Sequence, residues 1–101
     1  MSVAQKGRKK TADDPIFSPV TILNERGLHA RAASKFVKLV GQYDAEITVR
    51  KGSQTVSGQS ILGLMMLAAG PGSRIEICAT GAQAVEAFEA LRDLIEARFE
   101  E

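Results

Sequence analysis

The sequence is poor in the residues that build disulfides and metal sites. Its 101 residues include one cysteine and one histidine, so an internal disulfide is impossible and no familiar zinc-ligand spacing is present. We expect no metal and no cofactor. The cysteine, Cys78, lies in an alternating apolar stretch, which predicts a buried, unreactive thiol in a reducing compartment.

Long hydrophobic runs are also missing. The longest apolar run, residues 61–69, is far shorter than the roughly 20 residues that a membrane-spanning helix needs. The basic residues at positions 6–10 are followed by the polar residues 11–15 rather than by the apolar segment of a signal peptide. We therefore expect a soluble, cytoplasmic protein with no membrane partner.

Neither sign of charge dominates, and aromatic side chains are scarce. The net charge is +1 and the aromatic content is 5%, whereas nucleic-acid-binding surfaces are usually basic and often carry aromatic side chains. We expect no nucleic-acid partner. Residues 1–15 contain no apolar face and are predicted to form a flexible N-terminal arm. The alternative is that its basic cluster contacts an acidic partner or nucleic acid. Residues 16–101 are expected to form one small domain.

Hydrophobic periodicity predicts seven elements in this domain. Strands are expected over residues 17–23, 45–50, 55–57 and 74–79. One helix should end at Gly41, and a short helix should cover residues 61–67. The last helix should begin with a capping box of Thr80 and Gln83 and bury Ala84, Phe88, Leu91, Ile95 and Phe99. The order β-α-β-β-α-β-α indicates an α+β fold. We expect a two-layer open-faced sandwich, in which three helices cover one face of a four-stranded antiparallel sheet.

The predicted helix before Gly41 has two distinct faces. An apolar stripe repeats at helical spacing and should be buried, whereas a polar and basic stripe repeats on another face. The first consists of Ala33, Phe36, Val37 and Val40, and the second of Arg31, Ser34, Lys35 and Lys38. The basic stripe begins beside His29.

His29 is the strongest candidate for chemistry. It lies at a predicted helix N-terminus, where unpaired backbone N–H groups and the helix dipole favour anions. Gly27 permits a sharp bend or a close approach of the backbone, and Arg31 offers a guanidinium suited to phosphate. A neutral imidazole nitrogen can act as a nucleophile. The spacing alone fits a phosphorylated histidine and simple anion binding equally well.

The short helix is apolar almost all round. We expect Leu64 and Leu67 to face the core, with Ser60 at the helix N-cap. Ile61, Leu62 and Met65 should then point outward as an adaptable surface for partners. The alternative is that the N-terminal arm or a second copy of the chain covers them.

Two segments resemble one known family. Residues 27–33, Gly-Leu-His-Ala-Arg-Ala-Ala, are similar to the active-site signature of HPr, the histidine-containing phosphocarrier of the bacterial phosphoenolpyruvate-dependent phosphotransferase system. Residues 59–65, Gln-Ser-Ile-Leu-Gly-Leu-Met, resemble the regulatory serine segment of that family. The resemblance runs from about Phe17 to the end of the chain, and the family fold has the predicted order of elements.

The resemblance implies a stoichiometric phosphoryl carrier rather than an enzyme with its own small-molecule substrate. His29 would accept a phosphoryl group on Nδ1 from enzyme I and pass it to a IIA-type protein. Arg31 and the backbone N–H groups of Ala30 and Arg31 would stabilise the phosphate. An ATP-dependent HPr kinase/phosphorylase would phosphorylate Ser60.

The same resemblance implies how partners dock. Ile61, Leu62 and Met65, together with Lys38, would dock partner surfaces. The oligomeric state is open, and a monomer is the default for a carrier that must expose its site to successive partners. The alternative function is a regulatory interaction module that is controlled by Ser60 and transfers little phosphate. Sugar uptake and a nitrogen-type regulatory branch both remain open as the pathway.

The sequence departs from the family pattern at two positions. Ala33 stands where the family commonly has proline, a residue that preorganises the first helical turn. Arg26 stands where a small polar residue is frequent, and it would add positive charge beside the phosphate.

Overall fold

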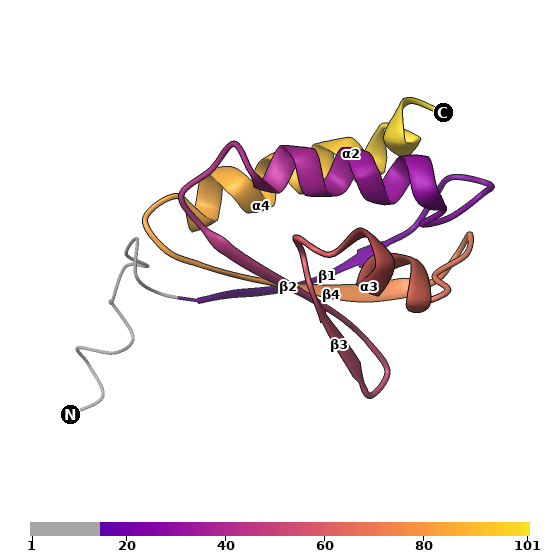
Figure 1. The fold of residues 1–101 in the computed structure, drawn as a ribbon, viewed down its shortest axis with the longest axis horizontal. Coiled ribbons are helices and arrows are strands. Elements are labelled where there is room, and N and C mark those ends of the chain that lie inside the picture. Colours follow the sequence, from indigo (N-terminus) through magenta and orange to yellow (C-terminus); the bar gives the residue numbers. More distant parts are fainter. Residues whose placement is uncertain (1–14) are drawn as a thin grey trace, which may run out of the picture.

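The computed structural model describes residues 15–101 (Figure 1). The predicted N-terminal arm over residues 1–15 therefore lies, apart from Pro15, outside the described residues. The strands are β1 (Ile16–Thr21), β2 (Glu46–Lys51), β3 (Gln54–Ser57) and β4 (Arg74–Thr80); the helices are α2 (Ala30–Val40), α3 (Ile61–Met66), α4 (Ala84–Glu96) and the 3-10 turn η1 (Arg98–Glu100). The predicted order β-α-β-β-α-β-α is confirmed.

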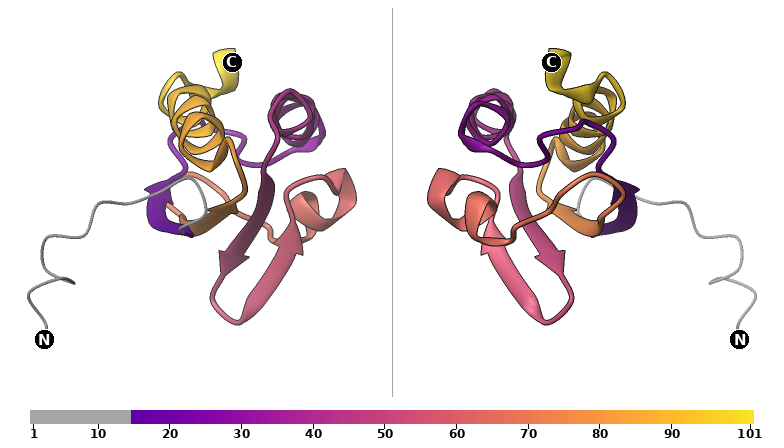
Figure 2. Two further views of the ribbon diagram at one scale, coloured as in Figure 1. Left: turned by 90° about the vertical axis from the view of Figure 1, so that its left-hand side faces the viewer. Right: turned by 90° about the vertical axis from the view of Figure 1, so that its right-hand side faces the viewer.

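The sheet is antiparallel throughout, with strand order β1-β4-β2-β3. Its register places Ile75 of β4 opposite Val20 of β1, and Ile77 of β4 opposite Val49 of β2. Alternating side chains of β4 consequently reach one face together with those of its two neighbours. Figure 2 shows α2 and α4 side by side over that face, with α3 beside β3. The predicted open-faced sandwich is thus confirmed.

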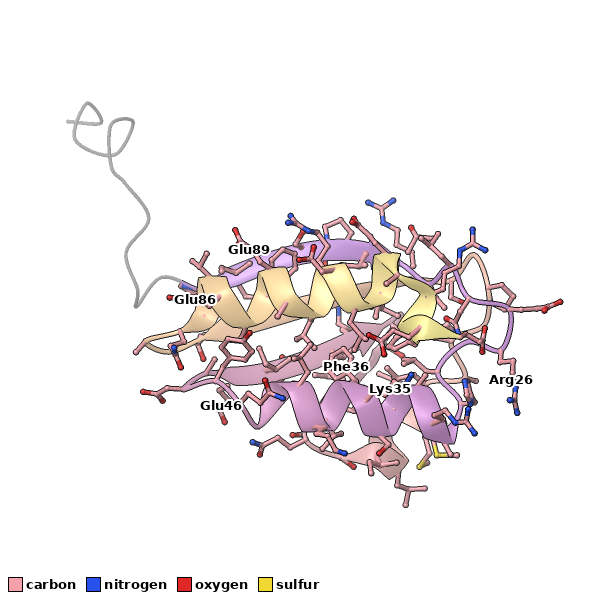
Figure 3. The ribbon with its side chains drawn as sticks, turned by 90° about the horizontal axis from the view of Figure 1, so that it is seen from above. Arg26, Lys35, Phe36, Glu46, Glu86 and Glu89 are labelled. Carbon is pink, nitrogen blue, oxygen red and sulfur yellow. The ribbon has the colours of Figure 1, made fainter. Side chains whose placement is uncertain are left out.

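The core lies between the sheet and the helices. Phe36 of α2 is fully buried, and Figure 3 shows it between α2 and α4. The predicted inward positions Ile47 and Val49 of β2 are buried as expected. Val37 is only partly buried, whereas Ala32, on the next row of α2, is fully enclosed. The buried stripe of α2 is therefore turned slightly towards Ala32.

The prediction of a buried cysteine is wrong. Cys78 is only half-buried, because the alternation of β4 sends Ile77 and Ala79 to the helices and Cys78 to the opposite face. The register sets Cys78 opposite Phe17 on β1, whose side chain is 68% exposed. The helices lie on the other face of the sheet, which explains why an apolar alternating strand leaves its thiol partly accessible.

Two expectations about the last helix are also wrong. Residue Gln83 is the N-cap of α4, but its side chain makes no capping hydrogen bond; its Oε1 instead accepts a hydrogen bond from the backbone N–H of Asp44 at 2.7 Å. Thr80 is still the last residue of β4. The helix ends at Glu96, before Phe99, which has a φ of 54° and is nevertheless buried.

Two kinds of feature are absent from the described residues. No helix in residues 15–101 is long and apolar enough to cross a membrane. In the same part of the chain, no three His, Cys, Asp or Glu side chains are grouped so as to hold a metal ion.

Candidate functional site

The loop between β1 and α2 is held tightly against the segment that follows α3. Gly27 has a φ of +64°, and a Cβ placed on it would lie 2.2 Å from the carbonyl oxygen of Ala69. That same oxygen accepts a hydrogen bond from the backbone N–H of Leu28 at 3.0 Å. Only glycine fits both the backbone conformation and the close approach. The loop therefore fixes where the chain enters α2.

His29 is the N-cap residue of α2. Its backbone is extended, and its carbonyl accepts the first helical hydrogen bond from Ala33 at 2.8 Å. Its side chain makes no capping hydrogen bond to the helix. The backbone N–H groups of Ala30 and Arg31 lie in the first turn of α2, where such groups have no acceptor within the helix. The dipole of α2 favours negative charge at the same place.

The imidazole of His29 lines a shallow, open hollow of about 300 Å³. The side chains around it include Arg26 from the loop and Met65 from α3, and residues 68–70 close the other side. The His29 side chain is 20% exposed, so it is held in place yet accessible. Figure 3 shows Arg26 projecting outward at this end of the molecule. Arg31 is exposed in the first turn of α2.

Sequence reasoning missed one acidic neighbour of His29. The Oε2 atom of Glu101 lies 3.3 Å from Nε2 of His29 and accepts a hydrogen bond from Nδ2 of Asn24 at 3.4 Å. Asn24 is fully buried and also donates to the carbonyl of Gly27 at 2.9 Å. A helix continued through Phe99, as the periodicity predicts, would have carried Glu101 away from this site. No local sequence signal indicates the contact.

Glu101 is held in its ionised form. Partial burial raises the pKa of its carboxyl group, but the hydrogen bond from Asn24, a backbone hydrogen bond from Arg26 and the charges of His29 and Arg26 together bring that pKa below its usual range. A carboxyl group whose pKa is lower in the folded than in the unfolded state stabilises the fold at pH values above its unfolded-state pKa. This stabilisation is lost as the pH falls through the folded-state pKa. The carboxylate is therefore a fixed negative charge beside Nε2 near neutral pH.

Ser60 is the N-cap of α3, as predicted. Its Oγ accepts a hydrogen bond from the backbone N–H of Gly63 at 2.9 Å. The two predicted core residues Leu64 and Leu67 are buried. The hydroxyl oxygen thus already serves a structural role at the start of this helix.

The outward face of α3 is apolar. The exposed fractions are 41% for Ile61, 67% for Leu62 and 39% for Met65. Met66, which the sequence analysis did not select, is 63% exposed. We call these four residues the α3 patch; because Met65 also lines the His29 hollow, the patch and the histidine form one continuous surface.

Lys38 does not join this surface directly. It lies later on α2 and lines a separate hollow of about 150 Å³ with Leu39 and, on α4, Leu94. The structure thus brings His29, Arg26 and Met65 together and places Lys38 on the neighbouring side of α2.

Comparison with known proteins shows the family to which the chain belongs. The family model described as "PTS HPr component phosphorylation site" matches residues 18–97. A protein named phosphocarrier protein HPr from Neisseria meningitidis is 48% identical over 82 residues, which cover 81% of this chain and 92% of that protein. A protein named phosphocarrier protein NPr from Shewanella violacea is 45% identical over 82 residues, covering 81% of this chain and 90% of that protein.

Solved structures show the same architecture. The chain matches HPr from Thermoanaerobacter tengcongensis with a TM-score of 0.81 and 37% identity, over 85% of this chain and 97% of that one. It matches HPr from Bacillus anthracis with a TM-score of 0.78 and 37% identity, over 82% of this chain and 99% of that one.

Proposed function

The chain belongs to the HPr family of phosphotransferase-system phosphocarriers, and on that premise we propose that His29 is its phosphoryl acceptor. In this proposal Nδ1 of His29 receives a phosphoryl group from phosphorylated enzyme I and passes it to a IIA-type protein. The observation that carries the proposal is the placement of His29. It is the single histidine of the chain, and it lies accessible at the N-terminus of α2, where its side chain makes no capping hydrogen bond.

The site suits reversible transfer between two proteins. Phosphoryl transfer depends mainly on positioning and on stabilisation of charge. The N–H groups of Ala30 and Arg31, the dipole of α2 and the Arg31 guanidinium supply positive potential where a phosphate on Nδ1 would be held. Arg26, which lines the hollow with His29, adds a further positive charge. A shallow site lets successive partners reach the same nitrogen.

Partners are proposed to dock on the α3 patch beside His29. Exposed methionine and branched aliphatic side chains adapt to different surfaces, and a contiguous apolar area is typical of an interaction site. Lys38 would contribute positive charge from the neighbouring side of α2. A monomer in the cytoplasm is the state in which enzyme I and IIA-type proteins could each reach the patch.

Ser60 is proposed as a regulatory site for HPr kinase/phosphorylase. Phosphorylation would add about 1.5 to 2 negative charges at the start of α3. Phosphate oxygens can replace the hydroxyl as acceptors of the Gly63 N–H, so the helix would be retained. The added charge would lie next to Ile61 and would repel acidic partner surfaces.

The substitution Ser60→Asp is expected to reduce kcat/KM for phosphoryl transfer from enzyme I by about tenfold, mainly through KM, because it places a charge in the docking surface. Ser60→Asn is the matched control, since asparagine is also a good N-cap residue but is neutral. Steady-state transfer kinetics with both variants make the comparison. Equal kcat/KM values for the two variants would show that charge at this position does not regulate docking.

Phosphoryl acceptance is tested by intact mass after incubation with phosphoenolpyruvate and catalytic enzyme I. The wild-type protein should gain one acid-labile phosphoryl group, and His29→Ala should gain none, because it lacks the nucleophile. Ser60→Ala is the control and should gain the same group as the wild type. An adduct of equal yield on His29→Ala would disprove the assignment of the acceptor.

A further inference from the structure

The chain makes an unusual turn after α4. Three consecutive residues, Arg98, Phe99 and Glu100, have φ values of 58°, 54° and 59°, in the left-handed region that residues with a side chain rarely adopt. The turn is held by burial of Phe99 and by a hydrogen bond of 2.7 Å from Nζ of Lys35 to the Phe99 carbonyl. Glu100 adds an ion pair with Lys35 at 3.5 Å. Such a backbone persists only where its surroundings enforce it.

The turn brings the end of the described chain to the start of α2. Figure 1 shows this end above the N-terminal end of α2, and Figure 3 shows Lys35 beneath the same turn. The carboxylate of Glu101 there meets Nε2 of His29, Nδ2 of Asn24 and the backbone N–H of Arg26. The match to the family model ends at residue 97, before Glu101.

We propose that Glu101 is a positioning residue that holds the imidazole of His29 with its proton on Nε2 and leaves Nδ1 as the nucleophile. This inference rests on the proposed phosphocarrier function. A neutral imidazole carries one proton, and a group on one nitrogen decides where that proton lies. A carboxylate 3.3 Å from Nε2 favours the proton on that nitrogen, so the lone pair of Nδ1 is free.

The step then balances without a proton transfer. The Nδ1 lone pair forms a bond to phosphorus, and the bond between phosphorus and the leaving atom of the donor breaks, with its electron pair retained by the donor. Nε2 keeps its proton, so the phosphorylated ring becomes a cation. The Glu101 carboxylate stabilises that cation from the side opposite the new phosphate, as a carboxylate does for the imidazolium of a catalytic triad.

The position of the proton can be observed directly. Long-range 1H–15N spectra of the full chain, recorded with 15N-labelled histidine at a pH where the ring is neutral, distinguish the two tautomers. The wild-type protein should show the Nε2–H form in excess, and Glu101→Ala should shift the ring towards a mixture. Glu101→Gln, which keeps an acceptor oxygen without the charge, should give an intermediate ratio. Glu89→Ala is the matched control, because that carboxylate is exposed on α4 and lies outside the turn, and it should leave the ratio unchanged.

Kinetics supply the second readout. Glu101→Ala should lower kcat for phosphoryl acceptance by about tenfold, as expected for loss of a group that orients a functional histidine, and should leave KM for enzyme I nearly unchanged, because the α3 patch is intact. An unchanged tautomer ratio, or a variant that accepts phosphate as fast as or faster than the wild type, would overturn the positioning role while His29 remained an acceptor. Failure of the wild type itself to accept phosphate would refute the carrier function, and the spectra would still decide the role of Glu101.

Discussion

Replacing Phe36 with alanine is expected to lower the free energy of unfolding by about 3–5 kcal/mol, because it removes a fully buried aromatic side chain and leaves a cavity. Phe36 lies between α2 and α4 (Figure 3), so its loss loosens the helix that presents His29. Urea denaturation followed by circular dichroism measures the change.

Phe17→Ala provides the matched control. The chemical change is identical, but Phe17 is 68% exposed on the outer face of the sheet, and substitutions at such positions usually change stability by less than about 0.5 kcal/mol. A comparable loss of stability in both variants would show that the helices do not form the packed layer described for this fold.

Gly27→Ala is expected to destabilise the protein by about 2–4 kcal/mol, which combines the cost of left-handed backbone with that of overpacking. The new Cβ would overlap the Ala69 carbonyl oxygen at 2.2 Å. Relief of this overlap moves the loop that leads into His29, so phosphoryl acceptance should also slow. Denaturant titration and transfer kinetics report the two effects.

Gly52→Ala separates the two causes. Gly52 has nearly the same φ, +61°, but nothing lies within 4 Å of the position of an added Cβ. Only the backbone cost of about 1–2 kcal/mol is expected there, with no change in transfer. If Gly52→Ala destabilised the protein as much as Gly27→Ala, the close packing of the His29 loop against residue 69 would be refuted.

The sequence predicts the layered fold well because its signals are local and periodic. Alternation in β2 and β4 and the helical stripe of α2 each identify a buried face, and the residues on these faces assemble into one core. The Ser60 cap could likewise be predicted, since the capping serine directly precedes the apolar run.

The errors concern tertiary context. Alternation shows that Cys78 and Ile77 lie on different faces of the sheet. It does not show that no helix covers the face on which Cys78 lies. The apolar spacing of Phe99 continues that of α4, yet the residue reaches the core from a left-handed turn. Burial of Phe99 and its bond to Lys35 decide this conformation, and neither can be deduced from neighbouring residues.

Some residues of the candidate site can be predicted from the sequence, and others cannot. His29 and Arg31 could be selected from a helix start preceded by Gly27 and from a resemblance to HPr. Asn24 and Glu101 could not, because their roles depend on a contact across 77 positions of the chain. The residues that position a functional group are thus harder to find from sequence than the group itself.

The central claim is that His29 carries a phosphoryl group between two proteins. Its most direct test is to phosphorylate the protein with enzyme I and phosphoenolpyruvate, remove both, add a IIA-type protein and follow the intact masses of carrier and acceptor with time. A carrier loses the mass of one phosphoryl group as the acceptor gains it, and His29→Ala shows neither change. A protein that never acquires the group, or that retains it while Ser60 is still modified by a kinase with ATP, would instead be a regulatory module.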